Sequence, residues 1–218
     1  AANVIATNSQ IQFVASSYAL QAVGNPSPAG NQVIAGNGLN ISGGGAADVS
    51  GTTDQLQFSH QLRNGDFDFK VRLESLTLTD PWAQAGLVAR EDLTAGSRSA
   101  GVFATPSISG VFFQTRTTVN GSKTASGAFP VNYPHTWLRL KRAGNNFTGF
   151  ASLDGAQWSQ LGATALILPQ SIYVGFAVSS RNSNTLATAA FRDFSAVTSP
   201  SSVGVPEFEP LGQSSRRT

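Results

Sequence analysis

The chain has 218 residues and a formal net charge of +2, and only 12% of its residues are charged, against roughly 25% in an average globular protein. It has no cysteine, which excludes disulfides, zinc–thiolate sites and thiol nucleophiles. The basic residues are dispersed and no stretch approaches 18 consecutive apolar residues, so we expect no nucleic-acid partner and no membrane span.

The start of the chain and its surface composition favour export. Methionine is absent, and Ala1-Ala2-Asn3 resembles the product of signal-peptide cleavage, although a trimmed initiator methionine is the alternative. The polar surface must come mainly from Ser, Thr, Asn, Gln and Gly, as in extracellular sandwiches. We therefore predict a secreted protein, extracellular or at the cell surface.

Residues 1–35 carry two short apolar runs, at 11–15 and 18–23, followed by a Gly- and Pro-containing loop at 24–30. We interpret this segment as an N-terminal strand extension, and residues 33–41 as a further strand that ends in three glycines. The main domain is expected to span residues 36–197.

Strict alternation identifies the central strands. Between residues 66 and 74, apolar side chains at odd positions alternate with charged side chains at even positions, which predicts a half-buried strand within residues 66–78, before the break at Asp80-Pro81. Residues 84–91, 101–104 and 110–118 are expected to be strands as well. In the last of these, Phe112, Gln114 and Arg116 share one face.

The strongest local pattern is the stretch 137–162, which predicts a three-stranded antiparallel meander. Its first strand alternates Leu with Arg and Lys, and Gly144 begins a tight turn into the return strand at 147–153. Asp154-Gly155 is expected to form a second two-residue turn before a strand at 157–161, with Trp158 buried in the core.

Further strands are expected at 171–179 and 186–197, which makes about a dozen short strands and almost no helix. This spacing indicates an all-β, antiparallel sandwich or barrel. Residues 198–218 form a Pro- and Ser-containing C-terminal tail. Such a tail becomes ordered only where its own domain or a neighbouring subunit holds it.

Several separated blocks resemble a known family in order along the chain. They are GAADVSGTTDQLQF at 45–58, GDFDFKVRLESL at 65–76, DPWAQAGLVARED at 80–92, GVFFQTRTT at 110–118, the meander, and YVGFAVSSRNSNTLATAAFRDF at 173–194. Together they resemble the secreted bacterial "regulation of enolase"-like domains, which implies a concanavalin A-like jelly roll. The resemblance covers residues 37–197, whereas residues 1–35 and 198–218 do not match it. Family members are mostly accessory modules of large extracellular proteins, and this chain is short by comparison.

The sequence favours a protein that is not an enzyme. Glucanases of the concanavalin A-like fold use Glu, Asp and Glu at alternate positions of one strand, and no such run occurs here. Asp66 and Asp68 alternate, but Asp68 is expected to face solvent. The two histidines, His60 and His135, are interpreted as ordinary turn or surface residues.

We expect no cofactor. Calcium is possible, because Asp48, Asp54, Asp80 and Asp92 lie in loops or at strand ends and lectin-like sandwiches often bind the ion through such residues. No dense Asp/Asn loop is present, so turn-forming aspartates are favoured.

One set of side chains forms a candidate carbohydrate site, provided that its strands are neighbours in a concave sheet. Five polar or basic side chains fall on strand faces opposite the predicted core: Arg90, Gln114, Arg116, Arg139 and Lys141. Trp82 and Trp137 could flank them and stack on a sugar ring. The candidate carbohydrate contacts are Trp82, Arg90, Gln114, Arg116, Trp137 and Arg139. The alternative is a solvated sheet face without a ligand, on which the arginine stems pack against their neighbours.

Two functional hypotheses follow. In the first, the protein is an exported structural subunit that binds copies of itself through its terminal extensions and builds a filament or surface layer, by adding a strand to a neighbour's open sheet edge. In the second, it is a lectin-like module that binds extracellular or cell-surface glycans on the concave face. The short chain and the absence of a catalytic carboxylate cluster favour the first, and the two are compatible.

Overall fold

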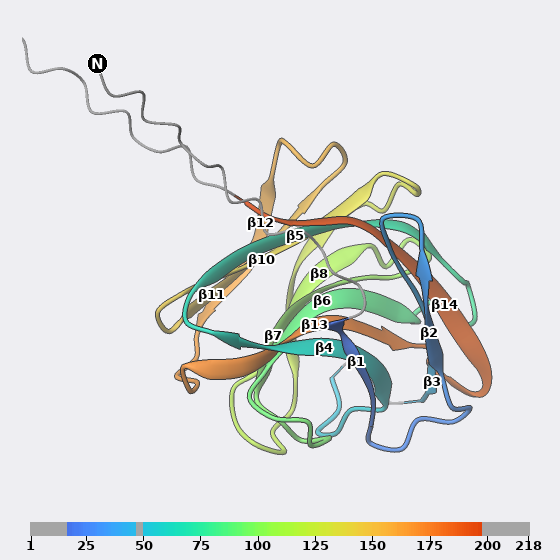
Figure 1. Ribbon diagram of the computed structural model, residues 1–218, viewed down its shortest axis with the longest axis horizontal. Helices are drawn as coiled ribbons and strands as arrows, with labels where there is room; N and C mark the ends of the chain where they lie inside the picture. Colours follow the sequence, from blue (N-terminus) through green and yellow to red (C-terminus); the bar gives the residue numbers. More distant parts are fainter. Residues whose placement is uncertain (1–16, 47–49, 198–218) are drawn as a thin grey trace, which may run out of the picture.

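The computed structural model describes residues 17–46 and 50–197, and these form two antiparallel seven-stranded sheets packed face to face (Figure 1). The order in sheet A is β1 (Ala19–Val23), β4 (Leu56–Asn64), β13 (Ser171–Ser179), β6 (Gln84–Arg90), β7 (Ser99–Ala104), β8 (Val111–Arg116) and β9 (Thr124–Phe129). The order in sheet B is β12 (Ser159–Ala165), β11 (Asn146–Ser152), β10 (Thr136–Ala143), β5 (Phe67–Leu76), β14 (Asn182–Ala196), β3 (Gly38–Gly45) and β2 (Asn31–Ala35). The predicted all-β antiparallel sandwich is confirmed.

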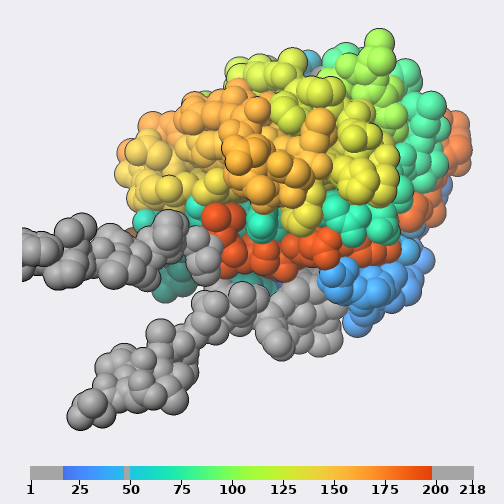
Figure 2. All heavy atoms as spheres, turned by 90° about the horizontal axis from the view of Figure 1, so that it is seen from above, coloured from blue at the N-terminus to red at the C-terminus, as the bar shows by residue number. Residues whose placement is uncertain are grey.

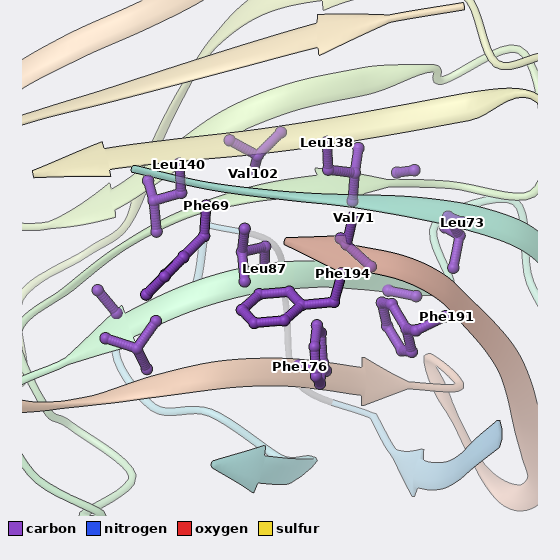
Figure 3. Close-up of a cluster of buried hydrophobic side chains, with 14 of the residues drawn as sticks. Phe69, Val71, Leu73, Leu87, Val102, Leu138, Leu140, Phe176, Phe191 and Phe194 are labelled. Atoms are coloured by element: carbon purple, nitrogen blue, oxygen red, sulfur yellow. The ribbon is translucent and has the colours of Figure 1, made fainter. Parts of the chain in front are cut away.

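The alternating positions of the strands form the core between the sheets. Figure 3 shows side chains of β5 and β10 from sheet B meeting those of β6, β7 and β13 from sheet A. Phe176 of β13 contacts both Phe191 and Phe194 of β14, at ring-centroid distances of 4.9 and 5.2 Å. Burial of these large apolar groups is the main force that holds the two sheets together.

The sequence predicts the facing of β5 and β8 correctly. Phe67, Phe69, Val71 and Leu73 point into the core from β5, and the intervening charged residues point outward. In β8, Phe113 lies in the core and Phe112 lies in a second apolar cluster, on the face of sheet A that points away from sheet B. We call that face the outer face of sheet A, and the corresponding face of the other sheet the outer face of sheet B.

The structure corrects two local predictions and adds one strand. Residues 33–41 form two strands instead of one, because Gly36 adopts a φ of 57° and the chain turns back at Gly36-Asn37. The Asp154-Gly155 connection is a loop from 153 to 158 instead of a two-residue turn, and the strand begins at Ser159. Strand β9 was not predicted, because its small residues show no apolar alternation.

The described part of the N-terminal segment belongs to the sandwich. Strand β1 pairs with β4 along five residues, and β2 pairs with β3 along five residues. Residues 1–16 and 198–218, which include most of the extensions predicted as connectors, lie outside the described residues.

Candidate functional site

The structure separates the six predicted contact residues. Arg90 in β6 lies on the outer face of sheet A, as do Gln114 and Arg116 in β8, whereas Trp137 and Arg139 in β10 lie on the outer face of sheet B. Trp82 stands apart in the loop between β5 and β6, with 44% of its surface exposed. The single polar surface expected from these residues is therefore not formed.

On the outer face of sheet A, the arginines form a buried ionic cluster around Asp54. Arg90 and Arg116 are 1% and 0% exposed. Arg90 Nη1 donates to Asp54 Oδ2 at 2.5 Å, and Arg116 donates to both carboxylate oxygens at 2.9 and 3.0 Å. Lys123 adds a third cation, with its Nζ 2.9 Å from Asp54 Oδ1. We call these four residues the Asp54 cluster.

Backbone carbonyls satisfy further donors of the Asp54 cluster. Arg90 donates to the carbonyls of residues 92 and 94, and Arg116 donates to those of residues 51, 95, 97 and 121. Three loops are thereby fastened over the outer face of sheet A, at residues 50–55, 91–98 and 117–123. Because the guanidinium groups are covered and already bonded, Arg90 and Arg116 are not available to bind a glycan.

The environment of Asp54 keeps its carboxylate ionised. Burial by itself favours the neutral acid, but Arg90, Lys123 and Arg116 outweigh burial and hold the pKa of Asp54 well below its usual value. Burial lowers the pKa of Lys123, and the two neighbouring arginines act in the same direction. Three cations thus share one carboxylate.

The outer face of sheet B instead presents partly exposed aromatic rings. The register places Lys70, Arg139, Phe150 and Gln160 in one row across β5, β10, β11 and β12. Arg139 binds both carboxylate oxygens of Asp68, at 2.7 and 2.6 Å. Its guanidinium also lies 4.8 Å from the centre of the Phe150 ring and 5.5 Å from that of Trp158. Arg139 therefore holds two aromatic rings in place.

Trp137 packs beside this group. A Cβ at Gly155 would lie only 2.8 Å from the Trp137 ring, so the glycine lets the 153–158 loop rest on the indole. Lys70 Nζ lies 5.4 Å from the centre of the Trp137 ring and donates to Gly155 O at 3.1 Å. We name this surface the aromatic face: Lys70, Trp137, Arg139, Phe150 and Trp158.

A hollow of about 430 Å³ adjoins the aromatic face, and it is lined by Phe129, Leu153, Asp154, Gln157, Trp158 and Ser159. The Asp154 side chain organises the loop, because its Oδ1 accepts hydrogen bonds from Ala156 N and Gln157 N, each at 2.8 Å. These bonds lower the pKa of Asp154, so its carboxylate stays ionised. In Figure 2 the yellow and orange atoms of the region from β9 to β12 form one continuous surface.

The sequence pattern predicts Trp158 in the core, and this prediction is wrong. The side chain is partly exposed at the junction of the hollow and the aromatic face. Its position follows from the length of the 153–158 loop, since a two-residue turn would have placed it within the strand. Residue spacing alone contained no signal for the longer loop.

The described residues contain no group of three or more His, Asp or Glu side chains that could hold a metal ion. Of the aspartates considered for calcium, Asp54 belongs to the Asp54 cluster, Asp80 accepts the Trp82 backbone N–H at 2.7 Å, and Asp92 accepts from Thr94. Asp48 lies outside the described residues.

The other groups considered for catalysis have structural contacts. Asp66 accepts the Gly144 backbone N–H at 2.8 Å, and Asp68 binds Arg139 through both carboxylate oxygens. His60 is buried on the outer face of sheet A against Phe58 and Tyr173, and burial lowers its pKa. Within residues 17–46 and 50–197, no helix is long and apolar enough to cross a membrane.

Comparison with known proteins identifies the fold. No family profile matches the sequence, and no curated protein matches it either. Among solved structures, a functionally unknown protein from Saccharomyces cerevisiae is similar over 92% of this chain and 100% of its own, with a TM-score of 0.62 and 17% identity. The carbohydrate-binding module CBM66 from Bacillus subtilis matches 78% of this chain and 95% of its own, with a TM-score of 0.51 and 15% identity.

A lectin shares the same architecture. Lectin II from Ulex europaeus matches 85% of this chain and 94% of its own, with a TM-score of 0.53 and 11% identity. The chain therefore has the concanavalin A-like jelly-roll fold that the sequence resemblance implied. At these identities the likeness establishes the fold and leaves the function to the residues of this chain.

Proposed function

We propose that this protein is a non-catalytic carbohydrate-binding module that binds sugars through the aromatic face of sheet B and the adjoining hollow. The observation that carries the proposal is the position of Trp158, whose ring joins the aromatic face to a hollow lined by Asp154, Gln157 and Ser159. Aromatic rings offer a flat apolar surface for the C–H face of a sugar, while carboxylate, amide and hydroxyl groups can bond its hydroxyls.

Preorganisation supports the proposal. Arg139 is held by two bonds to Asp68, and it contacts the rings of both Phe150 and Trp158. Ordering these side chains before the ligand arrives reduces the entropic cost of binding. The Bacillus subtilis and Ulex europaeus structures are a carbohydrate-binding module and a lectin, which makes this ligand class the natural first choice.

The test is affinity electrophoresis and calorimetry against a panel of soluble polysaccharides that includes glucans, xylans, mannans and fructans. Trp158→Ala should weaken binding about tenfold or more, since loss of a stacking contact of about 1.4 kcal/mol has that effect. Trp82→Ala is the matched control, because it removes an exposed tryptophan that lies off the aromatic face. The Trp82→Ala variant should bind the polysaccharide with the affinity of the wild type.

Two outcomes would reject the proposal: a wild-type protein that binds no polysaccharide of the panel, or equal affinities of Trp158→Ala and wild type. Release of reducing sugar from any bound polysaccharide would reject the non-catalytic part alone. Thermal unfolding of both variants separates loss of the site from loss of the fold.

A further inference from the structure

Among the described residues, strand β2 is an edge of sheet B, and its composition is unusual for an edge strand. It is the last strand of sheet B and pairs only with β3 among the described residues (Figure 1). Its sequence, Asn-Gln-Val-Ile-Ala, contains no charged residue and no proline. Val33 and Ile34 are 55% and 60% exposed. Natural edge strands usually carry charges, prolines or bulges that prevent pairing with another chain.

The opposite edges of the sandwich are protected. The register between β11 and β12 shifts at Gly149/Phe150, and that between β8 and β9 shifts between Val111 and Phe113. Strands β9 and β12 also approach each other closely: a Cβ added at Gly127 of β9 would lie only 2.6 Å from the backbone oxygen of Leu161 in β12. By contrast, β2 and β3 keep one register over all five pairs. Strand β1 is an edge as well, but none of its large apolar side chains is exposed.

We propose that β2 is a self-association edge, on which the β2 strand of a second copy of this chain pairs antiparallel across a two-fold axis. A two-fold axis that relates two antiparallel neighbouring strands is perpendicular to the sheet, so it leaves each side chain on the same face of the sheet. A residue on the outer face of one copy therefore lies opposite an outer-face residue of the second copy. Val33 lies on the outer face, because its partner Asn40 stands between the core residues Leu39 and Ile41.

The register that pairs all five residues places Val33 opposite its own copy. Ile34 then lies opposite Gln32 of the second copy, and Asn31 lies opposite Ala35. Every one of these pairs is free of charge repulsion, and the two exposed apolar side chains are brought to the contact. The seven strands of sheet B in each copy would join into one continuous sheet.

Five residues make a small interface, so the association should be weak, with a dissociation constant on the order of tens of micromolar. Analytical ultracentrifugation of the full chain from about 5 to 500 μM, a range set around that constant, should show the mass rising from 22.7 kDa towards twice that value. A wild-type protein that stays monomeric over this range would overturn the proposal.

Charge substitution at Val33 tests the register itself. Val33→Lys and Val33→Glu should each abolish the dimer, because like charges would stand directly opposite across the two-fold axis. An equimolar mixture of the two variants should dimerise again, since opposite charges would then face each other. A mixture that stays monomeric, or a Val33→Lys variant that dimerises like the wild type, would refute the assigned pairing.

Ile167→Lys is the matched control. Ile167 is an exposed apolar residue in the connection between β12 and β13, away from β2. The variant should dimerise like the wild type, and loss of its dimer would assign the contact to another surface. Hydrogen exchange gives an independent readout, because the backbone amides of β2 should exchange more slowly as the protein concentration rises. Exchange rates in β2 that do not depend on concentration would contradict association through this strand.

Discussion

The outer faces of the two sheets show how similar strand patterns acquire different roles. Each carries outward-pointing arginines, one of which contacts an aromatic ring: Arg90 contacts Phe58 on sheet A, and Arg139 contacts Phe150 on sheet B. On sheet A, Arg90 and Arg116 are sealed beneath loops and neutralised in part by Asp54. On sheet B, Arg139 pairs with Asp68 on its own sheet and remains partly exposed. The covering loops, rather than the strands, decide which face can meet a ligand.

The largest expected effect that tests this comparison is that of Asp54→Asn. It leaves three buried cations without a carboxylate, so the free energy of unfolding should fall by about 3–5 kcal/mol. Urea denaturation at pH 7 measures the change. Asp68→Asn is the matched control on sheet B, where the partly exposed pair should cost only about 1–2 kcal/mol. Equal losses in the two variants would show that the two faces do not differ in this way.

Acid should remove the contribution of Asp54. Its folded pKa is depressed, so its stabilising effect is complete above the unfolded value of about 3.9 and declines as the pH falls towards the folded pKa. Below pH 4, the stability difference between wild type and Asp54→Asn should shrink by up to about 1.4 kcal/mol per pH unit. Urea titrations between pH 7 and pH 2 measure this difference. A stability difference between the two proteins that stays constant from pH 7 to pH 2 would contradict the stabilising role assigned to the Asp54 carboxylate.

Gly155→Ala should disturb the aromatic face. Gly155 has a φ of 71°, and an added Cβ would lie 2.8 Å from the Trp137 ring, so we expect a loss of about 2–3 kcal/mol. Gly144→Ala is the control, because φ is 59° there and a Cβ would meet nothing within 4 Å. It should cost about 1 kcal/mol from backbone strain alone. Thermal or urea unfolding measures the stability loss of each variant, and near-ultraviolet circular dichroism reports the packing of the tryptophans. Equal stability losses in the two variants would show that the contact with Trp137 does not contribute.

The smallest effect is expected for Arg139→Lys. Lysine keeps the charge but loses the paired bonds to Asp68 and the planar contact with Phe150 and Trp158. Stability should fall by about 1 kcal/mol. Calorimetry with a bound polysaccharide should show weaker binding, because the Trp158 ring is held less firmly. Unchanged affinity would mean that Arg139 does not position the ring.

Much of the strand content follows from local pattern. The alternation in β5, the facing of β8 and the order of β10, β11 and β12 were predicted, because side-chain period and turn residues act over a few positions. The hairpin of β2 and β3 was missed, since one glycine at positive φ interrupts a run that otherwise suits a single strand. The candidate site was harder to predict, because it depends on which strands pair at long range.

The strand pattern of the sequence by itself determined that this chain is an antiparallel all-β protein and which face of its central strands is buried, and the family resemblance added the jelly-roll topology. Only the tertiary structure decided that Arg90 and Arg116 lie on one sheet, that Trp137 and Arg139 lie on the other, and that Asp54 reaches across the first. The physical reason is that alternation gives each strand an inner and an outer face, but says nothing about what covers the outer one. Here that cover comes from three loops: 91–98 and 117–123 directly follow β6 and β8, and 50–55 precedes β4. They are anchored by buried ion pairs whose attraction offsets the cost of desolvation.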